Sequence, residues 1–590
     1  MGTISDKLMR VINTKEDIRQ ALISKGYHIP TSIPFKEYAK MILDLPCNAN
    51  SFPDIEGIVA RYSALGLTNE QMAENPVWKD LTGNRHDLQM KNFAWSGMSG
   101  VGGYVQNFND FRNNTTVDKV RIDEQGSNSI KVTILTTGIN NAIYIIKNIY
   151  QFNKSYFIKI SSEGYNEGDL SLSFYALSTS TATTVKVPLN PNGITEIPAI
   201  KEDDFFAVYL DVGGKVGSIT IEQLPLYPGF ILGDGVDDFA VTEKELNFED
   251  TYTVYTAFIP FQDDPARNMI LCGKNDTKDF AINYSGTHLN FKPSTGVNLA
   301  VRIDQFALLV CKRNKDITTI INLSTGESRS LKSVEFISNP GLYYLWRNVF
   351  ATFHARAAIA GQTICNGYYS TDEDDEKVLD WYKKQYPWLF PNQAWTVVGK
   401  TNEDEDRATI ANITGNGNNL VLSNFGFAEG SGYNEEGEYA GYLVTDGVDD
   451  RVQDSSFKLN KDWTLVGEWV LLNQKATNAG IVKPFSFVIY NRTTGLSLFI
   501  NSGTSGTTIE NVKSIKAICS DGRIYLDDWS EMLINKDQNI TSSTSVLSIG
   551  FNGTAYTQIA LKNLGIYNDQ LLSKDDCIKA YNYLQTLKSK

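Results

Sequence analysis

Two short stretches of this chain place acidic side chains in a pattern that suits a divalent cation. Residues 232–239 read LGDGVDDF, and residues 444–451 repeat the pattern as VTDGVDDR. Each copy carries three aspartates within five positions: Asp234, Asp237 and Asp238, then Asp446, Asp449 and Asp450. Carboxylate oxygens are the ligands that calcium prefers, so each triad could bind a calcium ion. The same residues also favour a turn into a strand, because aspartate side chains accept hydrogen bonds from nearby backbone N–H groups.

Three acidic runs raise the alternative of a carbohydrate-active enzyme. Glycoside hydrolases need two carboxyl groups held about 5–10 Å apart in a cleft. The runs occupy positions 372–376, 403–406 and 435–438, in polar contexts that are typical of turns and helix starts. No Gly-x-Ser-x-Gly motif or phosphate-binding loop is present, and the histidines and cysteines are too scattered for a zinc site. We therefore expect no catalytic residues, with a polysaccharide depolymerase as the alternative.

Further repeats show how large the unit around each aspartate triad is. A β-rich run follows each triad, at 252–259 and at 463–472. Upstream, three stretches recur with an offset of about 332 residues: 68–70 with 401–403, 81–84 with 413–416, and 92–95 with 424–427. The triads themselves lie only about 212 residues apart, which predicts an insertion of about 120 residues in the first copy. An insertion of that size is long enough to form a domain.

The predicted fold is mainly β, with a short α-helical N-terminal segment. Residues 47–110 and 226–390 form a discontinuous first jelly roll, residues 111–225 an inserted β-sandwich, and residues 391–590 a second jelly roll. Short alternating strands predict the inserted sandwich, for example 129–134, 156–160 and 172–177. Each jelly roll should end in a helix, capped by Thr371 in the first copy and by Ser573 in the second, with acidic residues in the first turn.

Residues 1–46 differ from the rest of the chain. They predict three short amphipathic helices, whose apolar stripes are too small to form a core of their own. Either the following domain or a partner protein must cover these stripes, and the loop-like residues 47–54 favour a partner. The residues expected to dock are Ile18, Leu22, Phe35, Tyr38 and Ile42.

Composition excludes several functions for the 590-residue chain. A formal net charge of -14 argues against binding to nucleic acid or to anionic membranes. No apolar run reaches the length of a membrane span, and the first residues lack the apolar core of a secretion signal. We expect the protein to fold in the cytoplasm where it is made.

The two repeated units resemble laminin-G/concanavalin-A-like jelly rolls, as found in phage and bacterial surface proteins. The resemblance rests on the order of Gly-Asn, a strand, Asp-Gly-Val-Asp-Asp, further strands and a terminal helix, and covers about three fifths of the chain. Residues 13–21, 25–26 and 34–39 resemble the N-terminal segment of virion proteins from tailed phages of gut Bacteroidales, the crAss-like group among them. The resemblance implies a segment that attaches to the particle while the β domains project from it.

These features together predict a structural virion protein, a head fibre or decoration protein or possibly a tail fibre. Its partners would be a capsid or other virion protein, bound through residues 1–46, and host-surface glycans. Trp78, Trp95, Trp381, Trp388, Trp395 and Trp469 could stack on sugar rings, but tryptophan in a β-sandwich more often belongs to the core. No heptad run or fibrous repeat is present, so self-association would use globular faces and the N-terminal helices, with a dimer preferred over a trimer.

Overall fold

The computed structural model describes most of the chain outside its N-terminal segment. The described residues are 19, 52–146, 155–177, 182–198, 207–261, 268–274, 280–285, 288–292, 298–333, 336, 341–347, 354–415, 417–472, 479–483, 487–492, 495–500, 507–510, 514–533, 543–549 and 556–589. The predicted docking residues Ile18, Leu22, Phe35, Tyr38 and Ile42 lie outside this set, and their role stays a prediction.

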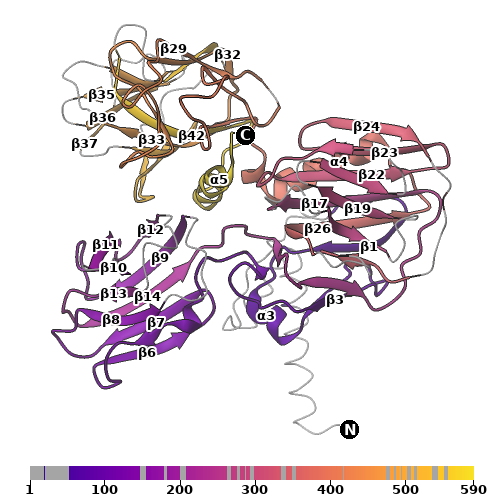
Figure 1. Ribbon diagram of the computed structural model, residues 1–590, viewed down its shortest axis with the longest axis horizontal. Coiled ribbons are helices and arrows are strands. Elements are labelled where there is room, and N and C mark those ends of the chain that lie inside the picture. The colour runs from indigo at the N-terminus through magenta and orange to yellow at the C-terminus, as the bar shows by residue number, and fades with distance from the viewer. Residues whose placement is uncertain are drawn as a thin grey trace. The chain divides into compact units, whose positions relative to one another are not determined.

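The fold is mainly β, as predicted, and its first jelly roll consists of two antiparallel eight-stranded sheets (Figure 1). The first sheet runs in the order β24 (Glu327–Lys332), β23 (Ile317–Asn322), β22 (Ala307–Arg313), β17 (Tyr252–Pro260), β26 (Arg356–Asn366), β15 (Ile231–Asp234), β4 (Gly100–Val101), and β1 (Ile58–Ser63) also pairs with β26. The second runs in the order β2 (Val77–Trp78), β3 (Leu88–Lys91), β16 (Phe239–Thr242), β25 (Tyr344–Leu345), β18 (Asn268–Gly273), β19 (Ala281–Ser285), β20 (His288–Lys292), β21 (Asn298–Ala300).

The second jelly roll repeats this topology strand for strand. Its first sheet is β40 (Glu531–Leu533), β39 (Arg523–Leu526), β38 (Ile515–Cys519), β33 (Trp463–Leu471), β42 (Ile559–Asn568), β31 (Tyr442–Val444), β30 (Gly432–Asn434), with β27 (Gln393–Thr396) on β42. Its second sheet is β28 (Thr409–Ile410), β29 (Leu420–Ser423), β32 (Arg451–Leu459), β41 (Ser543–Ile549), β34 (Ala479–Lys483), β35 (Phe487–Arg492), β36 (Gly495–Ile500), β37 (Thr507–Glu510).

The segment between β4 and β15 forms a separate small sandwich of two five-stranded sheets. One sheet is β11 (Ala182–Pro188), β10 (Ser171–Leu177), β13 (Ala207–Asp211), β8 (Asn141–Ile146), β5 (Arg112–Asn113). The other is β12 (Ile194–Ile197), β9 (Tyr156–Glu163), β14 (Gly217–Gln223), β7 (Ser129–Ile134), β6 (Val120–Gln125). None of these strands pairs with a jelly-roll strand in the sheets of the described residues.

The two jelly rolls differ at one hairpin. In the second copy, β30 and β31 are joined by a turn over residues 435–441, whereas in the first copy the equivalent β4 and β15 flank the inserted sandwich. Chain contacts divide the protein into two compact units, one made of residues up to Tyr104 with Tyr227–Tyr386, the other of Val105–Leu226 with Pro387 onward. The inserted sandwich therefore packs with the second jelly roll.

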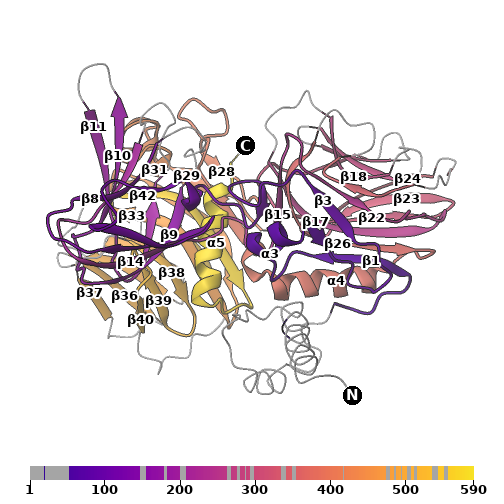
Figure 2. The ribbon, with the colours of Figure 1, turned by 90° about the horizontal axis from the view of Figure 1, so that it is seen from below.

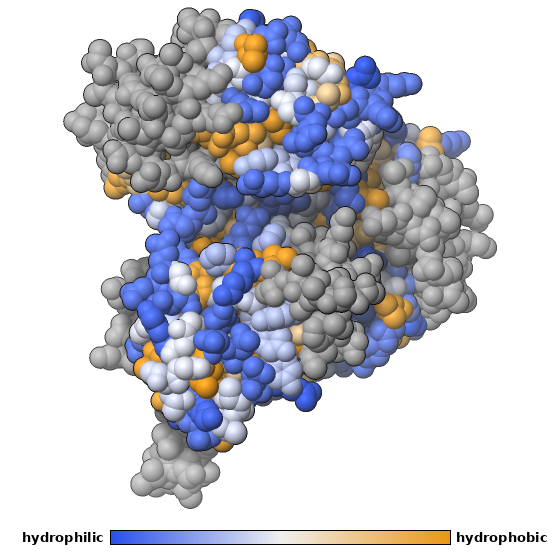
Figure 3. All heavy atoms as spheres, turned by 60° about the vertical axis from the view of Figure 1, so that its left-hand side comes forward, coloured by the Kyte–Doolittle hydropathy of each residue, from blue (hydrophilic) through white to orange (hydrophobic). Residues whose placement is uncertain are grey.

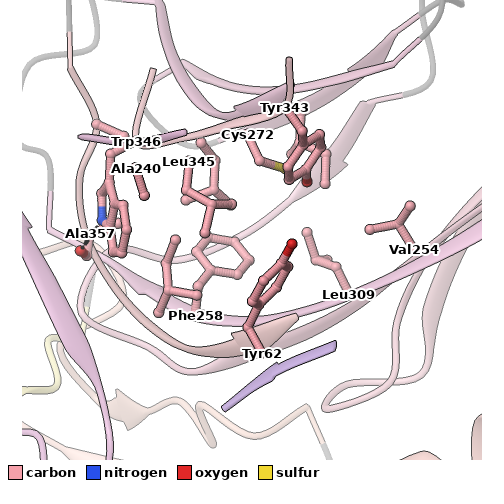
Figure 4. Packing of buried hydrophobic residues seen from close by; sticks show 14 of the residues in the cluster. Tyr62, Ala240, Val254, Phe258, Cys272, Leu309, Tyr343, Leu345, Trp346 and Ala357 are labelled. Carbon is pink, nitrogen blue, oxygen red and sulfur yellow. Dashed lines mark hydrogen bonds between the residues drawn. The ribbon is translucent and has the colours of Figure 1, made fainter. Parts of the chain in front are cut away.

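The core of the first jelly roll lies between its two sheets (Figure 4). Tyr62 from β1 and Phe258 from β17 point toward the opposite sheet, where Trp346 follows β25. The Trp346 ring packs 6.3 Å from the Trp78 ring, and its Nε1 donates a hydrogen bond to the Ala357 carbonyl at 2.8 Å. A buried tryptophan needs such a partner, because an unsatisfied N–H inside a core is costly.

Three described helices cap or flank these sandwiches. They are α3 (Asn69–Glu74), α4 (Asp372–Gln385) and α5 (Lys574–Thr586), with short 3-10 turns η1 (Phe108–Asp110) and η3 (Pro387–Leu389). Thr371 and Ser573 cap α4 and α5 as predicted. Asp375 anchors α4 to the outer side of its sheet, because it pairs with Lys312 of β22 at 2.5 Å and accepts a hydrogen bond from Tyr255 of β17 (Figure 2). None of the described helices is both long and apolar enough to cross a membrane.

Two loops cross from one sheet to the other at the same end of each jelly roll. In the first copy, residues 92–99 join β3 to β4 and residues 235–238 join β15 to β16; in the second copy, residues 424–431 and 445–450 do the same. Because β4 pairs with β15 and β3 with β16, both crossing loops lie side by side. We call this end of each sandwich, where the repeated aspartates lie, the rim.

Candidate functional site

The first rim contains a turn over residues 234–238, and the aspartate side chains of this turn accept hydrogen bonds from its own backbone. The buried Asp238 accepts the backbone N–H of Asp234 through Oδ2 at 2.9 Å, and Asp234 Oδ1 accepts the N–H of Val236 at 2.7 Å. Gly235 has φ +80°, and a Cβ there would meet the Arg356 Cβ at 2.8 Å, so only glycine fits. The turn leaves Val236 72% exposed at its tip.

The second rim has the same backbone and the same hydrogen bonds. Asp450, also buried, accepts the Asp446 N–H through Oδ2 at 2.7 Å, and Asp446 Oδ1 accepts the Val448 N–H at 2.7 Å. Val448 is 70% exposed, like its counterpart Val236. The interpretation of these aspartates as turn-forming residues therefore has direct support in both copies.

An asparagine from the neighbouring crossing loop ties each turn in place. Asn92 Nδ2 donates to the Asp237 carbonyl at 3.1 Å, and Asn424 Nδ2 donates to the Asp449 carbonyl at 3.0 Å. Both asparagines have a positive φ, 67° and 68°, a conformation that asparagine tolerates better than most residues. The repeated Asn-Phe motif in the sequence thus marks the tie between the two crossing loops.

The three carboxyl groups of each rim are brought together as a possible cation site. In each triad, one oxygen from each aspartate lies within 4.8 Å of the others. Burial raises the pKa of Asp238 to about 7 and of Asp450 to about 6, and the neighbouring carboxylates add to the effect. Asp238 Oδ1 is buried without a hydrogen-bond partner, whereas Asp450 Oδ1 accepts the Ser431 hydroxyl at 3.1 Å. The residues present fit calcium in their chemistry, and metal binding stays a prediction.

Sequence reasoning missed a group of side chains beside the first triad. Phe239 begins β16, directly after Asp238, and Arg347 lies over its ring with Cζ 3.9 Å from the ring centre. The same guanidinium lies 5.6 Å from the Tyr344 ring centre, and the His354 ring lies 6.2 Å from that of Phe239. The only signal in the sequence was the position of Phe239 next to the triad, because Arg347 and His354 reach the rim through strand pairing.

At the equivalent place on the second rim, Arg451 and Tyr556 stand where the first rim has Phe239 and His354. Arg451 follows Asp450 and so takes the position that Phe239 has after Asp238. Strand register gives the second correspondence: Leu232 pairs with Ala358, and its equivalent Val444 pairs with Ala560. Counting back four residues makes Tyr556 the counterpart of His354. Arg451 donates from Nε and Nη2 to the Tyr556 hydroxyl at 3.1 and 2.5 Å, and its Cζ lies 5.4 Å from the Tyr556 ring centre.

The acidic runs that suggested an enzyme have structural roles where the structure describes them. Asp374 completes the capping box of α4 with Thr371 and also accepts a hydrogen bond from Tyr368, and Asp375 pairs with Lys312. Asp406 pairs with Lys400 at 2.7 Å, and the run at 435–438 occupies the hairpin turn between β30 and β31.

One pair of carboxyl groups that the sequence did not reveal lies where the inserted sandwich meets the second jelly roll. Glu468 of β33 accepts hydrogen bonds from Tyr442 and Gln585 and lies 3.5 Å from Lys562 Nζ. Lys516 and Lys562 outweigh burial and lower the pKa of Glu468, whereas burial raises the pKa of Glu196 of β12. Glu196 lies 3.5 Å from Lys516 Nζ and 3.4 Å from the Tyr581 hydroxyl. Glu196 thus joins the inserted sandwich to the second jelly roll, whereas Glu468 bonds to Tyr442, Gln585 and Lys562 within the second jelly roll itself.

Tryptophans play mainly a core role. Trp78, Trp388, Trp395 and Trp469 are at most 2% exposed, so they cannot stack on a ligand from solvent. Trp95 and Trp381 are partly exposed. On the face drawn in Figure 3, hydrophilic residues predominate on the coloured surface and hydrophobic ones gather in separate groups.

No family model matches the sequence, and no curated protein matches it either. Among solved structures, it is similar to the botulinum neurotoxin type G receptor binding domain at 8% identity, covering 58% of this chain and 91% of that one with a TM-score of 0.26. It is also similar to the botulinum neurotoxin serotype C1 binding domain, at 10% identity over 56% of this chain and 88% of that one with a TM-score of 0.25.

A third similar structure is the VIP36 exoplasmic/lumenal domain in a form bound to Ca2+ and Man3GlcNAc. The identity is 9%, and the match covers 26% of this chain and 85% of that one with a TM-score of 0.19. At such TM-scores, these likenesses indicate nothing about the ligand or activity of this chain.

The buried Asp450 gives a pH-dependent prediction. Burial raises the folded-state pKa of Asp450 to about 6, above the ordinary pKa of an aspartate, so ionisation destabilises the fold progressively as pH rises from about 4 through 6. With a chelator present, Asp450→Asn should raise the free energy of unfolding at pH 8 by about 1–3 kcal/mol, because the amide oxygen still accepts the Asp446 N–H without a charge. The difference should vanish near pH 4.

Denaturant unfolding at several pH values measures this effect. The exposed Asp449→Asn is the matched control and should change stability by less than about 0.5 kcal/mol at every pH. A loss of stability in Asp450→Asn at pH 8 under metal-free conditions would contradict the assignment.

Proposed function

We propose that this protein is a structural virion protein, a head fibre or decoration protein, that docks through residues 1–46 and projects β domains able to bind host-surface glycans. The glycan-binding part of this proposal is supported by the rim. The chain contains two rims on equivalent strands, and each has an exposed turn at its tip. Two equivalent binding surfaces on one chain favour attachment to a repetitive surface, because linked weak sites raise the effective concentration.

The N-terminal part of the proposal has separate support. Residues 13–39 carry the resemblance to virion proteins of crAss-like phages. The sequence predicts apolar stripes in this segment that would need a cover from a partner protein. Self-association, with a dimer preferred over a trimer, belongs to the same proposal, since several docking segments would hold a particle far better than one.

Calcium belongs to the proposal as a rim ligand. Asp234, Asp237 and Asp238 would hold an ion on the first rim, and Asp446, Asp449 and Asp450 on the second. The bound ion would neutralise the crowded carboxylates and stiffen the turns, while the protein's own Asn92 and Asn424 hold those turns against the neighbouring loops.

Truncation tests the docking role. A chain lacking residues 1–46 should remain folded, because the described sheets use no residue before Ile58, and should no longer join particles when added to virions that lack the protein. The matched control is a chain that keeps residues 1–46 and lacks Val105–Leu226, which should still join. Normal occupancy of the truncated chain on particles would place the anchor elsewhere.

A glycan array with calcium and with a chelator tests the binding role. We expect the full-length protein to bind a defined subset of host-surface glycans, and more weakly when calcium is removed. The same glycans incubated with the protein should show no new reducing ends; their appearance would establish the alternative, a polysaccharide depolymerase. An array without any bound glycan would overturn the glycan-binding proposal.

A further inference from the structure

The crossing loop at residues 92–99 places a tryptophan at the surface of the first rim. Trp95 is partly exposed, whereas most tryptophans of the chain are buried in the cores of the sandwiches. Tryptophan often carries much of the binding energy at a recognition surface, because it offers a large and rigid apolar area. Trp95 also lies on the loop that contacts the aspartate turn, since Asn92 of the same loop donates to the Asp237 carbonyl at 3.1 Å. The ring is therefore part of the rim and can be reached from solvent.

The backbone at Trp95 adopts a conformation that is rare for a bulky residue. Its φ is 53°, and φ is 49° at the equivalent Phe427 of the second rim. This region crowds the Cβ of an L-residue, so the conformation costs free energy and needs support from the surrounding structure. In the first loop, Ser96 and Ser99 exchange backbone hydrogen bonds at 3.0 and 3.1 Å, and Ser99 Oγ accepts the Ala94 N–H at 2.8 Å. The side chain is thus held in place before a ligand binds, which reduces the entropy lost on binding.

The core supports the Trp95 ring from one side. The Phe93 ring lies nearly parallel to it, with ring centres 5.0 Å apart and an angle of 20° between the planes. Phe93 in turn packs edge-to-face against Trp346 of the core, at 5.4 Å (Figure 4). Among the described residues, no cation and no ring other than Phe93 lies over Trp95. The ring therefore rests on the core and keeps exposed apolar surface for a flat ligand.

The second rim holds its equivalent ring differently. The Arg407 Cζ lies 5.2 Å from the Phe427 ring centre, and the Tyr433 ring stacks on Phe427 at 6.4 Å. The first rim has Val101 in the place of Tyr433, because the two residues hold the same position on the equivalent strands β4 and β30. The two loops share one backbone, but a cation and a second ring cover the aromatic residue only in the second copy. The first rim is therefore the better platform for stacking.

We propose that the exposed surface of Trp95 binds a neutral pyranose unit of a glycan through the apolar C–H face of the sugar ring. This inference rests on the proposed glycan binding and names the stacking residue and the class of sugar. A ligand pocket combines apolar surface with a few polar groups that fix orientation. Asp237 is exposed on the neighbouring turn and would accept hydrogen bonds from sugar hydroxyls. The same carboxylate would repel a sugar that carries a carboxylate of its own.

The experiment measures the affinity of the full-length protein, at fixed calcium, for oligosaccharides that end in glucose or galactose and for matched ones that end in glucuronic or galacturonic acid. We expect at least one neutral probe to bind at least about tenfold more tightly than its acidic match. Trp95→Ala should reduce that affinity by about tenfold or more. Phe427→Leu is the matched control at the equivalent position and should change it by less than about twofold.

Saturation-transfer NMR adds a readout of the contact itself. The C–H protons on one face of the sugar should receive the strongest transfer from the wild-type protein, and Trp95→Ala should remove this preference. Equal transfer to both faces in the wild-type protein would contradict stacking.

The remaining outcomes distinguish this inference from glycan binding as such. Unchanged affinity in Trp95→Ala, or acidic probes that bind as tightly as neutral ones, would overturn the inference and leave glycan binding intact. An array without any bound glycan would overturn both. If Trp95→Ala lowers the thermal unfolding midpoint, Trp95→Phe decides, because the same loop already accommodates phenylalanine at position 427. A loss of about threefold or more is expected from the smaller ring, and unchanged affinity would overturn the role of Trp95.

Discussion

The structure depends on strand pairing between segments that the inserted sandwich separates in sequence. β4 precedes the insertion and β15 follows it, yet they form one antiparallel pair in which Val101 faces Ile231. Backbone hydrogen bonds close the junction: Tyr227 donates to Gly102 at 2.8 Å and Gly102 donates to Phe230 at 2.9 Å. The chain therefore leaves and re-enters the first jelly roll at one place, and the sheet is interrupted only in sequence. The rim follows from this closure, because Asn92 can reach Asp237 only when both crossing loops stand side by side.

A comparison of the two rims distinguishes the residues that hold the backbone of the turn from the residues that could contact a ligand. Asparagine, glycine and the buried aspartate are the same in both copies, and in each copy the asparagine donates to the turn and the buried aspartate accepts the backbone N–H of the first aspartate. The residues that follow the turn and face it from the next strand differ: Phe239 with His354 in one copy, Arg451 with Tyr556 in the other. A fixed turn with variable neighbours lets one architecture present different chemistry at two places, as binding loops on rigid scaffolds do.

The fold class and the capped helices could be predicted from the sequence because they depend on local patterns, and the repeat offsets were the signal that predicted an insertion. Thr371 and Ser573 could be identified as caps from their own neighbours. Arg347 and His354 could not be assigned to the rim, since they reach Phe239 across more than one hundred residues through sheet register, which a single sequence does not encode locally. The Glu196–Lys516 contact was hidden for the same reason: it joins the inserted sandwich to a strand of the second jelly roll.

Excision of the insertion tests the closure of the first jelly roll most directly. A chain in which a short turn, such as residues 435–441 of the second copy, replaces Val105–Leu226 should fold with the β4–β15 pair intact. Hydrogen exchange should then show the amides of Gly102 and Tyr227, which donate across this junction to the carbonyls of Phe230 and Gly102, protected to the same degree as in the full-length protein. Loss of protection at both amides, with the second jelly roll still protected, would contradict the account, because it would make the inserted sandwich a required part of the first jelly roll.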